Sequence, residues 1–345
     1  MRIALVNDTV TALEAMRRAL FARPGHELAW VAHDGLEATE LCARDTPDLV
    51  LMDLLMPRLD GVEATRRIMT HSPCAIVIVT ADVGSRSSKV FEAMGAGALD
   101  AVNTPVLQQP SAPGGSDALL AKVETIRRLL GADRANGRTA PTLPATPPVP
   151  RPHLPLVAIG ASAGGPTALA RVFSHLPKEF PAPIVVVQHV DAQFAPGLAT
   201  WLGSQTALQV RLARDGDWPE TGAVLLAAAD QHLVFKRPAQ LAYTRDPEHS
   251  PYRASVDTFF LSAKRFWPGD VIGVVLSGMG RDGAQGLLAL RAGGHHTIAQ
   301  DPRTSIASGM PRAAADLDAA REILGLDKIG PRLRNMVSQK RKAHG

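Results

Sequence analysis

The sequence predicts an α/β protein built from two doubly wound parallel-sheet domains that a proline-rich linker joins. Short β-rich runs alternate with helical patterns in residues 1–131, and the same alternation resumes in residues 154–338. Between them, residues 132–153 contain many prolines and no apolar period, so they cannot pack a core. A chain of 345 residues with 46% hydrophobic side chains is long enough for two cored domains.

The first half contains five strand-like runs separated by segments of helical periodicity. Such alternation is typical of parallel strands connected by crossover helices. The strand-like runs are RIALVN, ELAWVA, DLVLMD, AIVIVT and LDAVN, and the main helical segments are TALEAMRRALF, GVEATRRIM and SDALLAKVETIRRLLG.

The second half repeats this pattern and then becomes basic. Its strand-like runs are LVAIG, IVVVQH, AVLLAAA, HLVF, VIGVVLSG and TIAQ, and its helical segments include PTALARVFSHL and DGAQGLLALRAGG. The last stretch, RLRNMVSQKRKAHG, is weakly patterned, so we expect it to be solvated and to end in a basic tail over residues 339–345.

Composition narrows the class of protein. No apolar run is long enough to cross a bilayer, and the first residues lack a signal-peptide core, so we expect a cytoplasmic protein without membrane insertion. Much of the net charge of +4 lies in the linker and tail, which favours an acidic protein partner over nucleic acid.

Cys42 and Cys74 are far apart in the chain and match no disulfide or zinc motif, so we expect two small buried apolar residues.

Polar side chains follow the strands of the first domain. Because the carboxyl ends of parallel strands share one edge, Asp8, Asp53 and Thr80 are expected to lie together there. Two converging carboxylates repel each other unless a cation lies between them, and Mg²⁺ prefers oxygen ligands. One carboxylate would then be placed to attack phosphorus, with the threonine hydroxyl near the new oxygens. Any of these residues alone is more often a turn or a helix cap.

The motifs VND, LMDLLMPRLDG, VTA and GALDAVNTP make residues 1 to about 130 resemble a response-regulator receiver domain, which has a flavodoxin-like fold. The resemblance implies that Asp53 is the phosphoacceptor, that Thr80 is the switch residue, and that Mg²⁺ binds Asp8, Asp53 and the backbone carbonyl of Leu55. It also implies a histidine kinase as the phosphodonor.

Three positions depart from the receiver pattern. The family has two adjacent acids where this chain has Asn7 before Asp8, a lysine where it has Thr104, and an aromatic residue where it has Ala101. Since that lysine normally contacts the phosphoryl group, its loss predicts altered phosphorylation kinetics and signal transmission.

The second domain contains G-x-S-x-G in the sequence VAIGASAGGP, centred on Ser162, between a strand-like run and a helical segment. This context suits a nucleophile elbow, where small neighbours let a tight turn expose the hydroxyl and a helix N-terminus stabilises an oxyanion. Glycine-rich turns of this kind also bind phosphates, so the motif alone leaves both interpretations open.

A base and an orienting acid at the same sheet edge would favour the nucleophile. His189 ends IVVVQH directly at that edge and is the strongest candidate base, with His232 second. For the acid, Asp282 follows VIGVVL through a glycine-rich turn. Asp301 and Asp191 compete with it, and either is equally suited to be a cap or turn former.

The order Ser, His, Asp differs from that of α/β-hydrolases. The motifs IGASAGGP, VVVQH, YRASVD, LSGMGRDGAQG and QDPRTSIASGMPRAA instead resemble the Rossmann-like catalytic domain of the CheB family, the chemotaxis protein-glutamate methylesterases. The resemblance implies a Ser162, His189 and Asp282 triad, with the backbone N–H groups of Ala163 and Met279 as the oxyanion hole. The opening RIALVND and the missing receiver lysine are similar to the Wsp-type branch.

Other positions match the family in part. This chain has Ala163 where many members have threonine and Ala254 where they have proline, while four further residues match recurrent family residues that are candidates for support of the site: His232, Arg253, Ser255 and Asp257.

The resemblance implies a phosphorylation-regulated serine esterase that needs no cofactor for hydrolysis. It would remove methyl groups from glutamate esters on the cytoplasmic helices of chemoreceptors and deamidate glutamines at the same sites, with the receiver covering the active site until Asp53 is phosphorylated. Three alternatives stay open: a receiver-controlled transcription factor, which would need a helix-turn-helix; a nucleotide-binding module, which would need a lysine of the GKS/GKT type; and a degenerate esterase that acts as a scaffold.

Overall fold

The computed structural model describes residues 1–21, 25–81, 87–105, 116–132, 154–190, 192–228, 230–248, 252 and 254–344. The chain divides into two compact units, Met1–Asn136 and Gly137–Gly345. The expected linker, apart from Ala132, lies outside the described residues.

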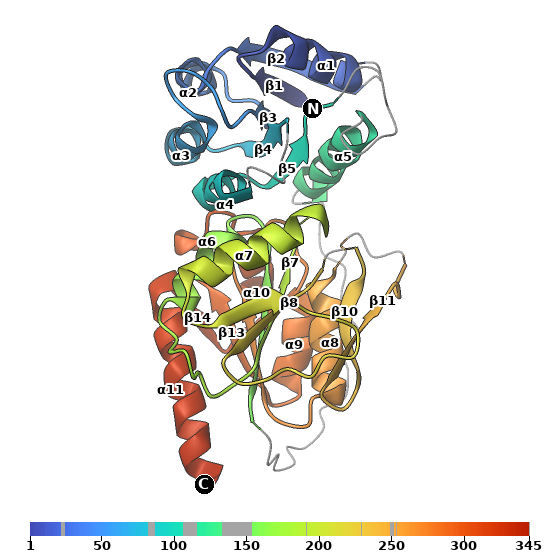
Figure 1. Ribbon diagram of the computed structural model, residues 1–345, viewed down its shortest axis with the longest axis vertical. Helices are drawn as coiled ribbons and strands as arrows, with labels where there is room; N and C mark the ends of the chain where they lie inside the picture. Colours follow the sequence, from blue (N-terminus) through green and yellow to red (C-terminus); the bar gives the residue numbers. More distant parts are fainter. Residues whose placement is uncertain are drawn as a thin grey trace. The chain divides into compact units, whose positions relative to one another are not determined.

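The first unit is a five-stranded parallel sheet with helices on both faces (Figure 1). The strand order β2-β1-β3-β4-β5 is that of flavodoxin-like folds, and it places the switch point between β1 and β3. Helices α1 and α5 cover one face, and α2, α3 and α4 cover the other. The bounds are β1 Arg2–Val6, α1 Val10–Phe21, β2 Glu27–Ala32, α2 Gly35–Arg44, β3 Leu49–Met52, α3 Gly61–His71, β4 Ala75–Thr80, α4 Ser87–Ala96, β5 Asp100–Asn103 and α5 Ser116–Ala132.

The strands of the first unit are apolar because both faces of the sheet are covered. Every residue of β3 and β4 is buried, which explains why these runs are continuously hydrophobic rather than alternating. At the carboxyl edge, Asp60 begins α3 by accepting a hydrogen bond from the Glu63 N–H at 2.9 Å. The helix therefore begins just after the loop that carries Asp53.

The second unit is a seven-stranded parallel sheet of order β14-β13-β12-β6-β7-β9-β8, with an antiparallel hairpin of β10 and β11 beside it. Helices α6, α7 and α11 pack together, and α8, α9 and α10 form the group that covers the other face (Figure 1). The bounds are β6 Leu156–Ala161, α6 Gly165–Phe173, β7 Ile184–Gln188, α7 Ala195–Gln205, β8 Gln209–Leu212, β9 Ala223–Leu226, β10 His232–Arg237, β11 Gln240–Thr244, α8 Val256–Phe266, β12 Val271–Val275, α9 Ala284–Ala292, β13 His296–Gln300, α10 Gly309–Asp316, β14 Glu322–Leu324 and α11 Leu326–His344; two 3-10 turns, Ala192–Phe194 and Pro302–Thr304, complete the unit.

The chain reverses its direction of winding between β12 and β6, so the crevice of this sheet opens at their carboxyl ends. The core beneath it is a cluster of buried aliphatic and aromatic side chains, in which the ring of Phe235 contacts those of Phe259 and Trp267. The predicted architecture of two parallel-sheet domains is confirmed.

Two expectations about the chain were wrong in part. Helix α11 runs to His344 and buries Leu333 and Val337 completely, so the start of the last stretch is packed and not solvated; the basic tail over residues 339–345 stays a prediction. Cys42 is buried as expected, whereas Cys74 is only half-buried, and their Sγ atoms lie 3.9 Å apart.

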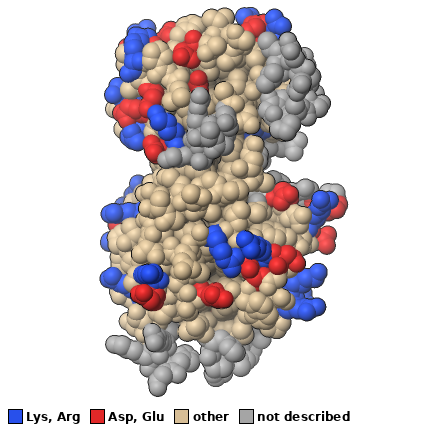
Figure 2. All heavy atoms as spheres, in the orientation of Figure 1, with Lys and Arg blue, Asp and Glu red and all other residues tan. Residues whose placement is uncertain are grey.

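Two further findings concern the charge of the surface and the hydropathy of the helices. On the face shown in Figure 2, lysines and arginines are interspersed with aspartates and glutamates. Within the part of the chain that the structure describes, no helix combines the length and apolar character that a bilayer span requires.

Candidate active site

The carboxyl ends of β6, β7 and β12 bring the three predicted catalytic residues to one edge of the second sheet. Gly160 pairs with Val187 and Ala161 with Gln188, so Ser162 and His189 leave adjacent strands at the same level. On the other side of β6, Gly160 pairs with Val275, and Asp282 follows β12 after a short turn. The switch point of the sheet therefore lies among these residues.

A tight turn presents Ser162 between β6 and α6. The backbone N–H of Ser162 donates to the Ser277 carbonyl at 3.0 Å, and Gly164 adopts a left-handed φ of 72° that favours glycine. Gly278 packs against the serine so closely that an added Cβ would lie 2.9 Å from Ser162 Cβ and 2.1 Å from Met310 Sδ. The small residues around the turn thus leave room for this one hydroxyl.

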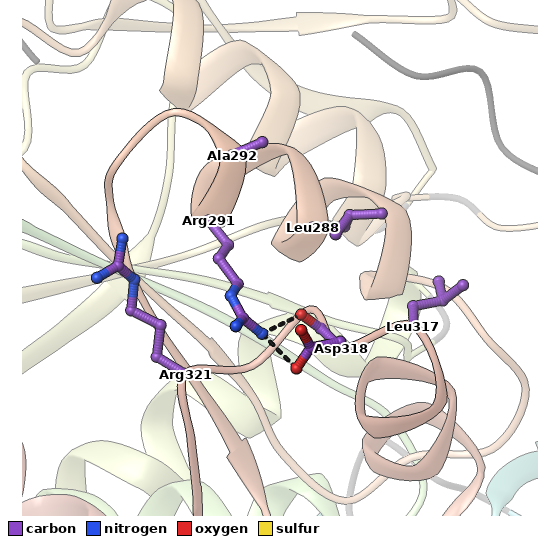
Figure 3. A pocket seen from close by; sticks show the side chains of 6 residues that line it. All are labelled: Leu288, Arg291, Ala292, Leu317, Asp318 and Arg321. Carbon is purple, nitrogen blue, oxygen red and sulfur yellow. Dashed lines mark hydrogen bonds and ion pairs between the residues drawn. The ribbon is translucent and has the colours of Figure 1, made fainter. Parts of the chain in front are cut away.

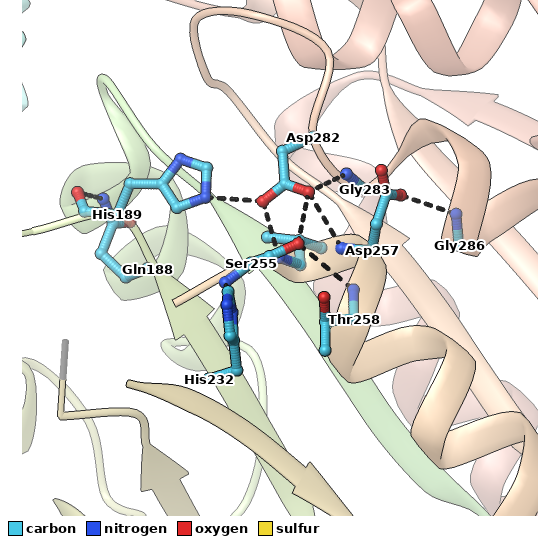
Figure 4. A network of polar contacts seen from close by, with 10 residues as sticks. Gln188, His189, His232, Ser255, Asp257, Thr258, Asp282, Gly283 and Gly286 are labelled. Atoms are coloured by element: carbon cyan, nitrogen blue, oxygen red, sulfur yellow. Dashed lines mark hydrogen bonds and ion pairs between the residues drawn. The ribbon is translucent and has the colours of Figure 1, made fainter. Parts of the chain in front are cut away.

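His189 is held by its ring and by its backbone. Its Nε2 lies 2.8 Å from Asp282 Oδ2 (Figure 4). Its backbone N–H donates to the Ala161 carbonyl at 2.9 Å. An ionised carboxylate only accepts hydrogen bonds, so Nε2 carries the proton and Nδ1 keeps its lone pair. The free lone pair makes Nδ1 the basic atom of this side chain.

Asp282 is a buried carboxylate whose oxygens are well satisfied. Besides His189, its oxygens accept the Ser255 hydroxyl at 3.0 Å and the N–H groups of Val256, Asp257 and Gly283 at 2.6, 3.0 and 3.1 Å (Figure 4). Three of these donors come from the first residues of α8, where the helix dipole favours a negative charge. Burial acts to raise the pKa of Asp282, but the hydrogen bond and charge of His189 and the backbone donors outweigh burial and lower the pKa.

The structure does not join the nucleophile to the base. Among the described residues, Ser162 Oγ makes no hydrogen bond to His189, whose side chain is 14% exposed. Contacts of this kind often tighten only when substrate binds. The base is thus oriented by Asp282 and partly exposed to solvent.

Two backbone N–H groups near Ser162 are available for an oxyanion. Within the described part of the chain, neither the Ala163 N–H nor the Met279 N–H donates to another protein group. Ala163 follows the nucleophile at the start of the α6 turn, and Met279 follows Gly278 on the neighbouring loop. Unpaired backbone donors near a hydroxyl suit the stabilisation of developing negative charge.

Sequence reasoning missed two side chains that hold this turn. Gln188 is fully buried, and its Nε2 donates to the backbone carbonyls of Ser162 at 2.8 Å and His189 at 3.0 Å. Ser277 donates its hydroxyl to the Ala163 carbonyl at 2.7 Å and accepts from the Ala307 N–H at 3.0 Å. A polar residue at the end of each apolar run, as in VVVQ and VVLS, was the available signal.

His232, the second candidate base, lies behind the acid and not beside the serine. It is fully buried, its Nδ1 accepts the Ser255 N–H at 3.0 Å, and its Nε2 lies 3.3 Å from the Pro247 carbonyl. Both contacts require the neutral tautomer with the proton on Nε2. Its neighbour Ser255 caps α8 and contacts Asp282, so His232 supports the acid through Ser255. Arg253, another candidate for support of the site, lies outside the described residues.

Tyr252 covers one face of the base. The rings of His189 and Tyr252 stack with centroids 4.9 Å apart and an interplanar angle of 9°. An aromatic face beside an imidazole stabilises the protonated form that a general base acquires during reaction.

A cavity of about 470 Å³ lies next to the acid and is lined by Tyr252, Ser255, Asp257 and Arg281, among others. Asp257 accepts the Gly286 N–H at 2.6 Å in this cavity. Burial and the nearby charge of Asp282 raise the pKa of Asp257 to about 7. This second carboxyl group is therefore partly protonated near neutral pH, whereas Asp282 stays ionised.

A second cavity, of about 480 Å³, lies beside α9 (Figure 3). Two arginines, Arg291 and Arg321, line it, and Arg291 pairs with Asp318 at 2.6 Å. Of the other acids considered from the sequence, Asp301 binds Arg303 at 2.7 Å and caps a 3-10 turn, and Asp191 lies outside the described residues.

In the first unit, the strand ends bring Asn7 and Asp53 together. Asn7 Nδ2 donates to Asp53 Oδ2 at 2.9 Å, and the Leu54 N–H donates to Asp53 Oδ1 at 2.7 Å. Asp8 is exposed on the same edge, and Thr80 is buried at the end of β4. The backbone N–H of Thr104, which stands where receivers have lysine, donates to the Thr80 carbonyl at 2.9 Å.

Comparison with known proteins gives the same division of the chain. Residues 157–333 match the CheB methylesterase family model, and residues 3–110 match the response regulator receiver domain. The chain is 54% identical over 343 residues to protein-glutamate methylesterase/protein-glutamine glutaminase 4 of Burkholderia thailandensis, covering 99% of each chain. A relative of the same name, numbered 1, from Pseudomonas fluorescens is 53% identical and covers 96% of this chain and 98% of its own length.

A solved structure resembles the second unit. The crystal structure of the CheB methylesterase catalytic domain of Thermotoga maritima has a TM-score of 0.51 and 34% sequence identity, and the match covers 55% of this chain and 99% of that one.

Proposed function

Because this chain belongs to the CheB methylesterase family and carries a receiver domain ahead of its catalytic domain, we propose that it hydrolyses glutamate γ-methyl esters on chemoreceptors. The observation that carries the proposal is the His189 to Asp282 hydrogen bond of 2.8 Å beside the Ser162 turn. The direct test is loss of methyl groups from methylated receptor peptides, measured by mass spectrometry with the wild-type chain.

The first half of the reaction forms an acyl-enzyme. Nδ1 of His189 takes the Ser162 hydroxyl proton as Oγ attacks the ester carbonyl carbon. Asp282 fixes the imidazole tautomer through Nε2 and stabilises the imidazolium that forms. The imidazolium then gives its proton to the departing methoxide, and methanol leaves.

The charge that develops on the carbonyl oxygen needs donors fixed in advance. We assign this role to the N–H groups of Ala163 and Met279, which have no other partner among the described residues. In the second half, His189 removes a proton from water, the hydroxide attacks the acyl carbon, and Ser162 regains its proton. The product is a glutamate carboxylate.

Glutamine deamidation follows the same steps with ammonia as the leaving group. Both activities stand in the names of the relatives at 53–54% identity. Since the amide is a poorer electrophile than the ester and its nitrogen must be protonated to leave, the deamidase reaction depends more strongly on His189.

The receiver supplies the regulation. We propose that Asp53 accepts a phosphoryl group from a histidine kinase and that Thr80 acts as the switch residue. Asp8, Asp53 and the Leu55 carbonyl form an oxygen-only donor set, which suits Mg²⁺, and these residues would hold it. A bound Mg²⁺ would offset charge on the phosphoryl oxygens. Phosphorylation would then raise the activity of the catalytic domain.

The substrate defines the remaining partners. The proposal places the reaction in the cytoplasm, on receptor helices whose glutamates surround the ester with negative charge. Arg281, exposed at the cavity beside Asp282, offers a positive charge to such a helix. Restoring each glutamate adds a negative charge to the receptor, which is the chemical basis of adaptation.

The other classes of protein have less support. A phosphate-binding turn would leave the paired His189 and Asp282 beside Ser162 without a role. A transcription factor would need a helix-turn-helix, and the second unit is instead a seven-stranded parallel sheet.

A further inference from the structure

The only two cysteines of the chain are in contact. Cys42 and Cys74 are separated by more than thirty positions, yet their Sγ atoms lie 3.9 Å apart. A buried residue touches about 6–12 others, so two residues drawn at random from 345 would touch with a probability of roughly 2–3%. The pairing is therefore unlikely to be a coincidence of composition.

The two thiols come from different elements of the receiver domain. Cys42 lies near the end of α2 and is fully buried, and Cys74 immediately precedes β4 and is half-buried. Cys42 Sγ is also 3.7 Å from the Ser72 carbonyl. Cys42 is thus shielded from solvent, whereas Cys74 is partly exposed as a residue.

We propose that Cys42 and Cys74 form a redox-sensitive dithiol site in which a hydroperoxide creates an intramolecular disulfide. Hydrogen peroxide oxidises one thiol to a sulfenic acid and releases one water. The second sulfur attacks this sulfenic sulfur, forms the S–S bond and releases a second water. The two thiols lose two protons and two electrons in total, and these reduce the peroxide to two molecules of water.

The chemistry of the pair supports this reaction. The contact between the two thiols lowers the pKa of Cys42 to about 7, while the same contact and burial raise the pKa of Cys74, so Cys42 is the sulfur that ionises first. The thiolate is the nucleophile in disulfide formation, so the pair contains a reactive form near neutral pH. From 3.9 Å, the sulfurs need to approach by about 2 Å to reach the bond length of ~2.05 Å.

The disulfide would close a loop that runs from α2 through β3 and α3 to the start of β4, with Asp53 inside it. Cys74 precedes β4, whereas Thr80 ends it, so the bond would form at the edge of the sheet opposite the phosphorylation site. We therefore expect oxidation to stabilise the receiver without contacting Asp53. This inference is independent of the proposed esterase activity.

The test uses the full chain before and after treatment with hydrogen peroxide. We expect maleimide labelling of the denatured protein to fall from two thiols to none, the intact mass to drop by two hydrogens, and peptide mapping to find Cys42 joined to Cys74. The unfolding temperature of the receiver should rise and return to its starting value with dithiothreitol.

Cys42→Ser and Cys74→Ser are the matched controls, and neither should gain stability from peroxide. The proposal is overturned if the wild-type chain keeps both thiols under peroxide, if only intermolecular disulfides form, or if sulfinic acid accumulates at either position. Peptide mapping of the wild-type chain decides this even if a serine variant folds poorly.

Discussion

Nε2 of His189 lies 2.8 Å from Oδ2 of Asp282, and the same carboxylate accepts three backbone N–H groups and one hydroxyl. The acid is thus fixed by the start of α8 before it contacts the base. This arrangement orients the imidazole with Nδ1 free, and four of the predictions below depend on it.

Asp282→Asn should reduce kcat for ester hydrolysis by about 10³ to 10⁴, because an amide group favours the wrong imidazole tautomer. KM should change little, since Asp282 lies behind the base and does not contact substrate in this mechanism. Steady-state kinetics on a small methyl ester would check both values, and an unchanged kcat would remove Asp282 from the catalytic machinery.

The same variant, Asp282→Asn, tests whether Asp282 is ionised in the folded protein. Because the folded protein lowers the pKa of Asp282, the ionised carboxylate stabilises the fold above its ordinary pKa of about 4. This contribution is lost as the pH falls through the lowered pKa. Asp282→Asn should therefore be less stable than the wild type at pH 7, and the difference should shrink in acid; urea unfolding at several pH values measures it.

Asp257→Asn should show the opposite dependence on pH. The pKa of Asp257 is raised to about 7, so the folded state binds more protons than the unfolded state between pH ~4 and ~7, and wild-type stability falls with rising pH over this window. The asparagine retains an acceptor for the Gly286 N–H but does not titrate. The stability of the variant relative to the wild type should increase from pH 5 to pH 8, whereas a constant difference would contradict the assigned pKa.

His232 should act as a positioning residue. His232→Leu removes the acceptor for the Ser255 N–H, so we expect kcat to fall by about 10- to 100-fold with KM nearly unchanged. His232→Asn can place an oxygen near the Nδ1 position and should recover most of the activity. Equal activity of both variants would mean that this hydrogen bond does not support Asp282.

Asn7→Asp should increase the response of the receiver to Mg²⁺. The change replaces the amide donor to Asp53 with a second carboxylate, so without a cation the receiver should lose on the order of 1–3 kcal/mol. Added Mg²⁺ should raise the unfolding temperature of this variant more than that of the wild type. Asn7→Ala removes the hydrogen bond without adding charge and serves as the control, which should not gain that response.

Periodicity was sufficient to predict the fold, and strand-end placement and motifs indicated the candidate site residues, but neither predicted the contacts between side chains. Continuous apolar runs marked the buried strands, and polar residues after them marked Ser162, His189 and Asp282. The edge strands β8 and β14 were missed because they are short and only partly buried. The role of His232 depends on a hydrogen bond to the start of α8, and the contact between Cys42 and Cys74 depends on how α2 packs on the sheet; neither has a sequence period.

The central claim is that Ser162 is the nucleophile, and methanol release from receptor membranes carrying methylated glutamates tests it most directly. The wild-type chain should release methanol at a rate that rises with a phosphodonor, and Ser162→Ala should release none above the uncatalysed background while keeping its unfolding temperature. Methanol release by the folded alanine variant at the wild-type rate would contradict the account.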